Sequence, residues 1–479
     1  MDRAIWWARR DLRLEDNQAL AAACSRAGAV VPLFVLDPAI LESDRVGEKR
    51  VAFLFGGLRS LDHSLRQRGS RLILRRGDPA VEVARLVREV GAGAVFAERD
   101  HSPFARERDG RVAEAAPLQL VGGPTVRPPE DVLKSDKTPY QVYGAYARAW
   151  RALPWDSAPA LLPSSLGVPP KLDSLPVPES PRQSEESYLE ATEAAAGRQL
   201  RSFTAGDEAP IYRYAEERDR LDRDAASGLS PYLRFGLISA GRVVAAAFEA
   251  MDAAPEETAE QSADGWLGEL IWREFFEHLL YGFPHAQDGP FRREYAGIAW
   301  RHDPEGLAAW QEGRTGYPVV DAAMRQLAHT GRMPNRARMV AASFLVKDLL
   351  IDWREGERWF LQHLVDGDPA LNNGNWQWVA GTGADAAPYF RVFNPVEQGR
   401  RHDPAGDYVR RWVPEVAAVP ARYVHAPWTM PEAEQRRCRC RIGHDYPAPM
   451  VDHREARERT LAAYAAGRAP AEGRTYGAQ

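Results

Sequence analysis

Cysteine is scarce in this sequence, and long apolar runs are missing from it. Three cysteines in 479 residues give no disulfide framework, and this usage is typical of a reducing compartment. No apolar signal region opens the chain, and no apolar run is long enough to span a bilayer. These absences predict a cytoplasmic protein that contacts no membrane.

The chain also lacks a strong excess of charge of one sign. Its formal net charge of -5 argues against a protein that coats nucleic acid without specificity, whereas a local basic patch that grips phosphates is compatible with this value. Hydrophobic residues make up 44% and charged residues 27% of the chain, as in soluble globular proteins. The length predicts about two or three domains.

Short apolar runs alternate with amphipathic segments in the first hundred residues. The runs that predict strands are 4–8, 29–36, 71–74 and 94–97. The segments that predict helices are 17–27, 51–68 and 79–90. Strands separated by helices indicate βαβ units and a parallel, Rossmann-like sheet. Turns at 77–79 and 99–103 are then expected at the carboxyl edge, where ligands of such sheets bind.

A proline-rich segment from about residue 122 to residue 181 shows little periodicity, which predicts a long connection. Helical periodicity dominates after it, in the runs 186–205, 240–251, 266–281, 321–330, 337–351 and 354–364. We therefore predict an α/β domain over residues 1–130, a linker over residues 131–190 and an all-α domain over residues 191–479.

Two predicted helices combine side chains that are unusual together. Glu269, Trp272 and Arg273 share one face, since they are spaced i, i+3 and i+4; a core stripe with a salt bridge is the alternative interpretation. At a second helix start, an amide, two cations and a thioether fall within about one turn, at Asn335, Arg336, Arg338 and Met339. Such a group can read a base edge, grip a phosphate and pack against a flat ring.

The segment 366–378 is rich in asparagine, glycine, acids and indoles. Its side chains include Asp366, Asp368, Asn372, Trp376 and Trp378. Such a segment fills a core poorly, because each buried amide needs a partner, but it suits a polar heterocycle. A surface loop built from turn residues is the alternative.

A turn of small residues lies upstream, after Tyr214, and leads into a helix. Its members are Ser227, Gly228, Leu229 and Ser230. Their backbone N–H groups can face a phosphate, and a plain helix N-cap at Ser230 accounts for the same residues.

These motifs, together with others, resemble the photolyase/cryptochrome family over nearly the whole chain. In chain order they are WWARRDLRLEDNQAL, SGLSPYLRFG, ELIWREF, GRTGYPVVDAAMRQL, NRARM, DGDPALNNGNWQWVAGTGADAAPYFRVFNP and YPAPMVDHREARERTLAAY. Among the branches, the chain looks most like the class I photolyases that repair cyclobutane pyrimidine dimers.

The resemblance implies that the helical domain binds FAD. The residues that it assigns to the cofactor are Tyr214, Ser227, Gly228, Leu229, Ser230, Trp266, Arg273, Arg338, Asp366, Asp368 and Asn372. Arg338 with Asp366 is expected to offset the charge of the reduced flavin. Asn372 matches the position that faces flavin N5, where a neutral amide is compatible with the fully reduced anion.

The family also has a chain of three tryptophans, which match Trp300, Trp353 and Trp376 among the fourteen of this sequence. Their expected role is to pass electrons to the resting flavin under light. The alternative interpretation is three ordinary core tryptophans.

Repair is expected to proceed by electron transfer from excited reduced FAD to a flipped-out dimer in ultraviolet-damaged DNA; photolyases are a worked example of base flipping. By resemblance, Trp272 and Trp378 form stacking walls and Glu269 bonds the pyrimidine edge. The rim of the pocket and the phosphate contacts are assigned to Asn335, Arg336, Met339 and Arg218.

This chain departs from the family pattern at two places, and the identity of a second chromophore is not determined by the resemblance. Arg332, Met333 and Pro334 replace a common tryptophan–methionine–histidine run, and Ala226 replaces a threonine of the phosphate turn. The α/β domain is expected to hold a second, antenna chromophore. We favour methenyltetrahydrofolate over a deazaflavin or another flavin.

Three other functions are the alternatives. A cryptochrome-like photoreceptor is expected to have a C-terminal extension and often a residue other than asparagine at the position of Asn372. A (6-4) photolyase is expected to have histidines near residues 333–335, and a non-catalytic interaction protein leaves the acids and indoles without a purpose. Cys438 and Cys440 lack zinc spacing, so no metal site is predicted. We expect a monomer with no obligate protein partner.

Overall fold

The computed structural model describes residues 1–154, 160–163, 166, 171–185 and 188–468. The chain divides into two compact units. Unit 1 comprises Met1–Arg218, Ala225–Pro284 and Leu361–Leu371, and unit 2 comprises Asp219–Asp224, His285–Phe360 and Asn372–Gln479. No helix in the described part of the chain is long and apolar enough to cross a membrane.

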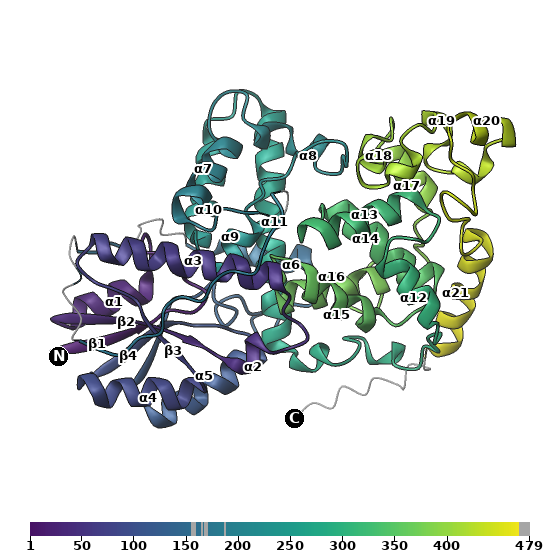
Figure 1. Ribbon diagram of the computed structural model, residues 1–479. Helices are drawn as coiled ribbons and strands as arrows, with labels where there is room; N and C mark the ends of the chain where they lie inside the picture. Colours follow the sequence, from purple (N-terminus) through teal and green to yellow (C-terminus); the bar gives the residue numbers. More distant parts are fainter. Residues whose placement is uncertain (155–159, 164–165, 167–170, 186–187, 469–479) are drawn as a thin grey trace. The chain divides into compact units, whose positions relative to one another are not determined.

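A five-stranded parallel sheet with the strand order β3-β2-β1-β4-β5 forms the first part of unit 1 (Figure 1). The strands are β1 (Arg3–Trp7), β2 (Ala29–Leu36), β3 (Ile73–Arg76), β4 (Ala94–Glu98) and β5 (Leu118–Val121). The predicted parallel sheet is therefore confirmed. Sequence analysis placed β3 two residues too early and missed β5, which is short and only half-buried.

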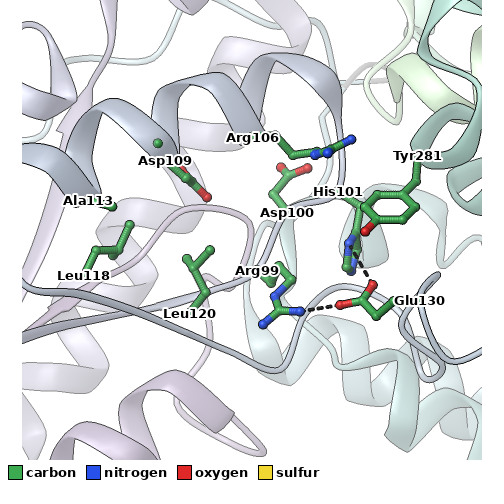
Figure 2. A pocket seen from close by; sticks show the side chains of 11 residues that line it. Arg99, Asp100, His101, Arg106, Asp109, Ala113, Leu118, Leu120, Glu130 and Tyr281 are labelled. Carbon is green, nitrogen blue, oxygen red and sulfur yellow. Dashed lines mark hydrogen bonds and ion pairs between the residues drawn. The ribbon is translucent and has the colours of Figure 1, made fainter.

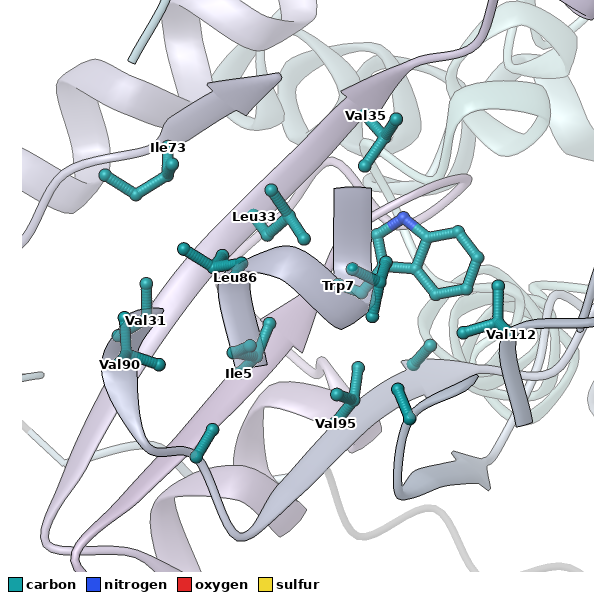
Figure 3. Close-up of a cluster of buried hydrophobic side chains, with 14 residues drawn as sticks. Ile5, Trp7, Val31, Leu33, Val35, Ile73, Leu86, Val90, Val95 and Val112 are labelled. Atoms are coloured by element: carbon teal, nitrogen blue, oxygen red, sulfur yellow. The ribbon is translucent and has the colours of Figure 1, made fainter. Parts of the chain in front are cut away.

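Helices α1 (Gln18–Arg26) and α3 (Glu48–Gln67) cover one face of the sheet, and α4 (Pro79–Val90) and α5 (Pro103–Ala115) cover the other (Figure 1). The short helix α2 (Pro38–Leu41) follows β2. Alternate strand residues such as Ile5, Val31 and Leu33 point to one face, where they pack with Leu86 and Val112 (Figure 3). Helix α5 was not predicted, because charged side chains interrupt its apolar stripe.

The proline-rich segment, which was predicted as a long connection with little periodicity, contains a helix that was not predicted. Helix α6 (Tyr143–Ala152) forms there and buries Tyr146 and Trp150. The Trp150 indole N–H donates a hydrogen bond of 2.6 Å to the Glu274 carboxylate. Two buried rings spaced i and i+4 anchor this helix, which is too small a signal to stand out between prolines.

The remaining helices of unit 1 lie beyond residue 192. They are α7 (Glu193–Thr204), η1 (Pro210–Arg213), α8 (Tyr214–Glu217), α9 (Ser230–Phe235), α10 (Ala240–Asp252) and α11 (Glu257–Gly282). The helix predicted over residues 186–205 begins only at Glu193, since the Thr192 hydroxyl caps it; residues 186 and 187 lie outside the described part. Helix α11 begins nine residues before the predicted start at 266.

Unit 2 consists of helices in its described part. Those that matter below are α12 (Pro304–Gln311), α13 (Pro318–Thr330), α14 (Asn335–Ser343), most of α15 (Trp353–His363) and α16 (Pro369–Ala380), and α21 (His453–Gly467). The end of α15 and the first residues of α16 belong to unit 1. Shorter pieces complete it: η2 (Pro284–Gln287), η3 (Arg293–Tyr295), α17 (Pro395–His402), α18 (Asp407–Trp412), η5 (Pro414–Val416), α19 (Ala421–Val424), η6 (Pro427–Thr429) and α20 (Glu432–Arg437). The predicted fold class, an α/β part followed by an all-α part, is confirmed.

The continuous helix predicted over residues 337–351 is interrupted. Helix α14 ends at Ser343, and a π-helical turn, η4 (Phe344–Asp348), follows it. This turn carries Lys347, whose side chain is fully buried. Its ammonium donates to the carbonyls of Ala380 at 3.0 Å and Tyr389 at 3.3 Å, and it lies 3.9 Å from the ring centre of Tyr464.

Lys347 makes stability depend on pH. Burial lowers its pKa to about 7, so between that pH and its ordinary pKa near 10.5 the unfolded chain binds one proton more than the folded chain. The unfolding free energy of the wild type should therefore rise with pH over this window, by at most about 1.4 kcal/mol per pH unit. Lys347→Met should flatten the rise in urea titrations, whereas the change of an exposed lysine, Lys171→Met, should not. An equal slope in all three proteins would contradict this assignment.

Candidate functional site

The residues assigned to a flavin are distributed over both units. Unit 1 contains the turn before α9, Trp266, Arg273, Asp366 and Asp368, and unit 2 contains Arg338, Asn372 and the three tryptophans of the predicted electron-transfer chain.

The loop Asp366–Gly367–Asp368 leads from α15 into α16 and contains a buried charge. The Asp368 carboxylate lies 2.7 Å from Arg10 Nη2 and 3.6 Å from Arg234 Nε. Its other oxygen accepts from the backbone N–H groups of Ala370, at 2.9 Å, and Leu371, at 3.3 Å. Burial alone raises the pKa of Asp368, but these arginines and N–H groups hold it below its ordinary value. Asp368 is therefore a fixed anion.

Arg10 connects this loop to the sheet. It follows β1, and besides Asp368 it lies 3.5 Å from Asp100, after β4, and 3.8 Å from Glu277 of α11. Arg273 lies 3.2 Å from the same Glu277 and donates to the Pro124 carbonyl at 2.9 Å. Four elements of unit 1 thus share one buried network of charges.

The turn before α9 is open to solvent and requires a glycine. Gly228 has φ +65°, which favours glycine, and Ser227 and Gly228 are not buried. The plainer interpretation, a cap at Ser230, is wrong: Leu229 occupies the N-cap, no side chain caps the helix, and the Ser230 hydroxyl donates to Asp366 at 2.6 Å. The start of α9 therefore has no side-chain cap at its N-cap residue.

Two aromatic residues assigned to the cofactor pack on a common neighbour in unit 1. The Tyr214 ring centre lies 6.0 Å from that of Phe203, and the Trp266 ring centre lies 5.1 Å from it. Trp266 is buried, whereas Tyr214 at the start of α8 is partly exposed and has the Arg218 guanidinium 5.4 Å from its ring centre.

The face of α11 that carries Glu269 and Trp272 is partly open to solvent. Glu269 forms an ion pair of 2.7 Å with Arg218, and both side chains are about one-third exposed, at 32% and 34%. Trp272 stacks on Tyr143 of α6, with 3.7 Å between ring centres and 7° between planes. The Tyr143 hydroxyl donates to the Gly268 carbonyl at 2.8 Å, and burial, followed by the charge of Glu269, raises its pKa to about 12. Tyr143 was missed because it lies in the segment predicted as linker.

Helix α14 in unit 2 presents the predicted rim residues. Asn335 is exposed at its first position, and its amide lies 4.0 Å from Met339 Sδ. Arg336 forms an ion pair with Asp219, so it must exchange this partner before it can bind a phosphate. Arg338 Nε donates to the Met333 carbonyl at 2.8 Å.

Asn372 and the three tryptophans lie in unit 2. Asn372 is buried, and its Nδ2 donates to the Glu357 carbonyl at 2.8 Å, which fixes the amide plane. Trp376 and Trp353 are buried, and Trp300 is partly exposed. Such a gradient is what the predicted route from flavin to surface requires.

Other aromatic rings line this group. The Trp376 ring centre lies 4.9 Å from Phe360 and 6.1 Å from Trp310, a buried indole that sequence analysis did not single out. The Trp300 ring meets Tyr464 edge to face at 5.9 Å. A Cβ on Gly356 would overlap the Trp376 indole, so glycine is needed there. Trp378 is half-buried on α16.

A cavity of about 330 Å³ lies in unit 1 beside the carboxyl ends of β4 and β5. Figure 2 shows Asp100 and His101 after β4, Arg106 on α5, and Tyr281 of α11 around it. The His101 and Tyr281 rings meet edge to face at 5.6 Å. Glu130 forms an ion pair with Arg99 and lies 3.7 Å from His101. This is one of the post-strand turns where sequence analysis expected a ligand.

Family models and known proteins match nearly the whole chain. The family model described as DNA photolyase matches residues 4–164, and the model described as FAD binding domain of DNA photolyase matches residues 266–466. The chain is 39% identical to the deoxyribodipyrimidine photo-lyase of Synechococcus sp., over 96% of each chain. It is also 39% identical to that of Escherichia coli, over 96% of this chain and 98% of the relative. The chain belongs to the DNA photolyase family.

Solved structures of photolyases have the same fold. A class III photolyase from Agrobacterium tumefaciens is 37% identical, with a TM-score of 0.90 over 98% of both chains. A cryptochrome from Synechocystis is 27% identical, with a TM-score of 0.87 over 96% of this chain and 99% of that one. The predicted family and the predicted FAD-binding domain are confirmed.

The stacked pair gives this photolyase a testable feature. Tyr143→Ala should weaken the binding of dimer-containing DNA by up to about tenfold, because the plane of Trp272 loses its support. Tyr143→Phe keeps the ring and serves as the control, with affinity close to the wild type. Equilibrium binding of a fluorescent thymine-dimer oligonucleotide in the dark measures the effect. Equal affinity of the Ala variant would show that the stack does not position Trp272.

Proposed function

We propose that this photolyase is a deoxyribodipyrimidine photo-lyase, which splits cyclobutane pyrimidine dimers in DNA with blue light and reduced FAD. The observation that carries the proposal is the likeness, over 96% of the chain, to relatives of that name. The departures at 332–334 and 226 leave the other assigned residues in place.

The residues present fit FAD. In unit 1, the exposed and uncapped helix start before α9 suits a diphosphate, and the fixed Asp368 carboxylate suits a hydrogen-bond donor. When bound and reduced, FAD supplies the electron that splits the dimer. Further contacts in unit 1 are assigned to Tyr214, Trp266, Arg273 and Asp366. In unit 2, Arg338 and Asn372 are assigned to the flavin ring; the Asn372 amide is fixed by Glu357 and cannot ionise.

The assigned DNA contacts divide into positioning and recognition. Arg218 and Arg336 are assigned to phosphates, which set the position of the lesion without reading sequence. Both have carboxylate partners in the free protein, Glu269 and Asp219. An exchange of Arg218 from Glu269 to a phosphate also frees Glu269 to accept from the pyrimidine edge.

The remaining lesion contacts are aromatic and polar. Trp272 and Trp378 are assigned as stacking walls, since an indole offers every base a flat apolar face. Asn335 and Met339 complete the rim on α14.

An antenna chromophore in unit 1 is part of the proposal, with methenyltetrahydrofolate favoured. Its support is the cavity of about 330 Å³, which combines the Tyr281 ring with His101 and Arg106 (Figure 2). We also propose a monomer without an obligate protein partner. A cytoplasmic location is supported by three free cysteines.

Two alternative functions have less support. The observation in support of a cryptochrome-like photoreceptor is the likeness to the Synechocystis cryptochrome. That protein is 27% identical to this chain, whereas a relative named as a repair enzyme is 39% identical. A (6-4) photolyase lacks support because no histidine lies within residues 332–335.

Repair of a thymine-dimer oligonucleotide tests the function directly. Purified, chemically reduced protein under blue light should restore the thymines, and the same mixture in the dark should not. Chromatography of the strand gives the count of restored thymines. Repair of a (6-4) lesion instead, or of neither lesion by protein that contains reduced FAD, would overturn the proposal.

The role of Trp376 can be separated from repair. Trp376→Phe should strongly slow the photoreduction of oxidised flavin, because phenylalanine is far harder to oxidise, and it should leave repair by chemically reduced protein nearly unchanged. Trp412→Phe, outside the assigned chain, is the control and should change neither rate. Flash absorption and the repair assay measure the two rates. An equal loss of both in the Trp376 variant contradicts the assignment.

A further inference from the structure

Arg50 is a buried cation of α3 that holds main-chain carbonyls rather than a carboxylate. Its Nη2 donates to the carbonyls of Leu361 and Leu364, the latter at 2.9 Å, and its Nε donates to Leu364 at 3.0 Å. Its Nη1 lies 3.4 Å from the Arg45 carbonyl. The side chain therefore caps the carboxyl end of α15, where carbonyls lack partners within the helix.

The main chain next to Arg50 has no room for a side chain. A Cβ on Gly367 would overlap the Arg50 guanidinium, and a Cβ on Gly47, before α3, would overlap the Gln362 carbonyl. The start of α3 thus packs directly on the backbone of residues 361–367, in the same unit. Gly367 stands between Asp366 and Asp368, so Arg50 defines the path of the chain at both carboxylates.

The charge of Arg50 acts in the same direction as its hydrogen bonds. Burial, and after it the charge of Arg234, lowers the pKa of Arg50 to about 9, although Asp366 and Asp368 oppose this shift. The guanidinium is therefore charged at neutral pH and favours the ionised form of both aspartates. Arg10 holds the Asp368 carboxylate at 2.7 Å, and Arg50 holds the backbone beneath it.

We propose that Arg50 is a positioning residue for FAD: it fixes the loop that carries Asp366 and Asp368, and thereby sets how tightly this photolyase retains its cofactor. The inference rests on the proposed assignment of these two aspartates to FAD. It gives the α/β part a role in cofactor binding that is independent of any antenna chromophore.

The test is the affinity of the full-length, FAD-free protein for FAD, measured by the quenching of flavin fluorescence. Arg50→Met should raise the dissociation constant by about tenfold or more, because two carbonyls and the loop lose their support. Arg50→Lys keeps the charge but loses the planar guanidinium with its several N–H donors. Its dissociation constant should therefore lie between those of the wild type and Arg50→Met. Arg66→Met, at a 61% exposed arginine of the same helix, should bind as the wild type does.

Two further measurements separate the possible outcomes. Asp366→Asn should raise the dissociation constant for FAD, and an unchanged constant would show that the assignment of the aspartates to FAD is wrong. If Asp366→Asn binds FAD weakly but Arg50→Met binds it as tightly as the wild type, only the role of Arg50 is overturned. Far-ultraviolet circular dichroism and the melting temperature of the FAD-free proteins report folding. If Arg50→Met does not fold, the test uses Arg50→Lys alone. A folded Arg50→Lys protein that binds FAD more weakly than the wild type supports the proposal. An Arg50→Lys protein that binds FAD with wild-type affinity, or that does not fold, overturns it.

Discussion

The structure of unit 1 depends on buried arginines that are held by distant carboxylates and carbonyls. Arg10, from the end of β1, pairs with Asp368, 358 positions away, and Arg50 binds carbonyls 311 and 314 positions away. An unpaired charge in such surroundings is strongly unfavourable, so these side chains fold only with their partners in place. The α/β part and the loop assigned to FAD are therefore one cooperative element, although more than 300 residues separate them.

This constraint explains how a loop with two neighbouring carboxylates can have a fixed conformation inside unit 1. Asp368 stays ionised because Arg10 and Arg234 lower its pKa, and its backbone partners begin α16. The first residues of α16 then lead to Asn372 and Trp376. The charged network thus fixes the first residues of α16 within unit 1.

Much of the fold could be predicted from the sequence, because β1, β2 and β4 are buried apolar runs and α4 has a strong amphipathic pattern. Helices α5 and α6 could not, since the first is interrupted by charges and the second is anchored by only two buried rings. In α6 the stabilising contact is with a distant residue, Glu274, which leaves no periodic pattern in the helix itself.

The candidate site likewise contains residues that the sequence predicted and residues that it did not. The residues assigned to FAD and the lesion came from motifs that resemble a family, and their chemistry alone left plain alternatives open. Tyr143, Arg10 and Arg50 were missed, because each acts through a partner far along the chain: Trp272, Asp368 and Leu364. A single sequence carries no signal for such pairs.

Because Arg10 and Arg50 hold the loop 366–368, the protein itself orders this loop before FAD binds. Hydrogen exchange of the FAD-free protein, followed by mass spectrometry over residues 364–371, tests it most directly. The backbone N–H groups of Gly367, Ala370 and Leu371 are hydrogen-bonded to Leu364 and Asp368, so they should be protected nearly as well as those of the sheet. Exchange at the rate of an unstructured chain, with protection only after FAD is added, would show that FAD, and not the buried arginines, orders the loop.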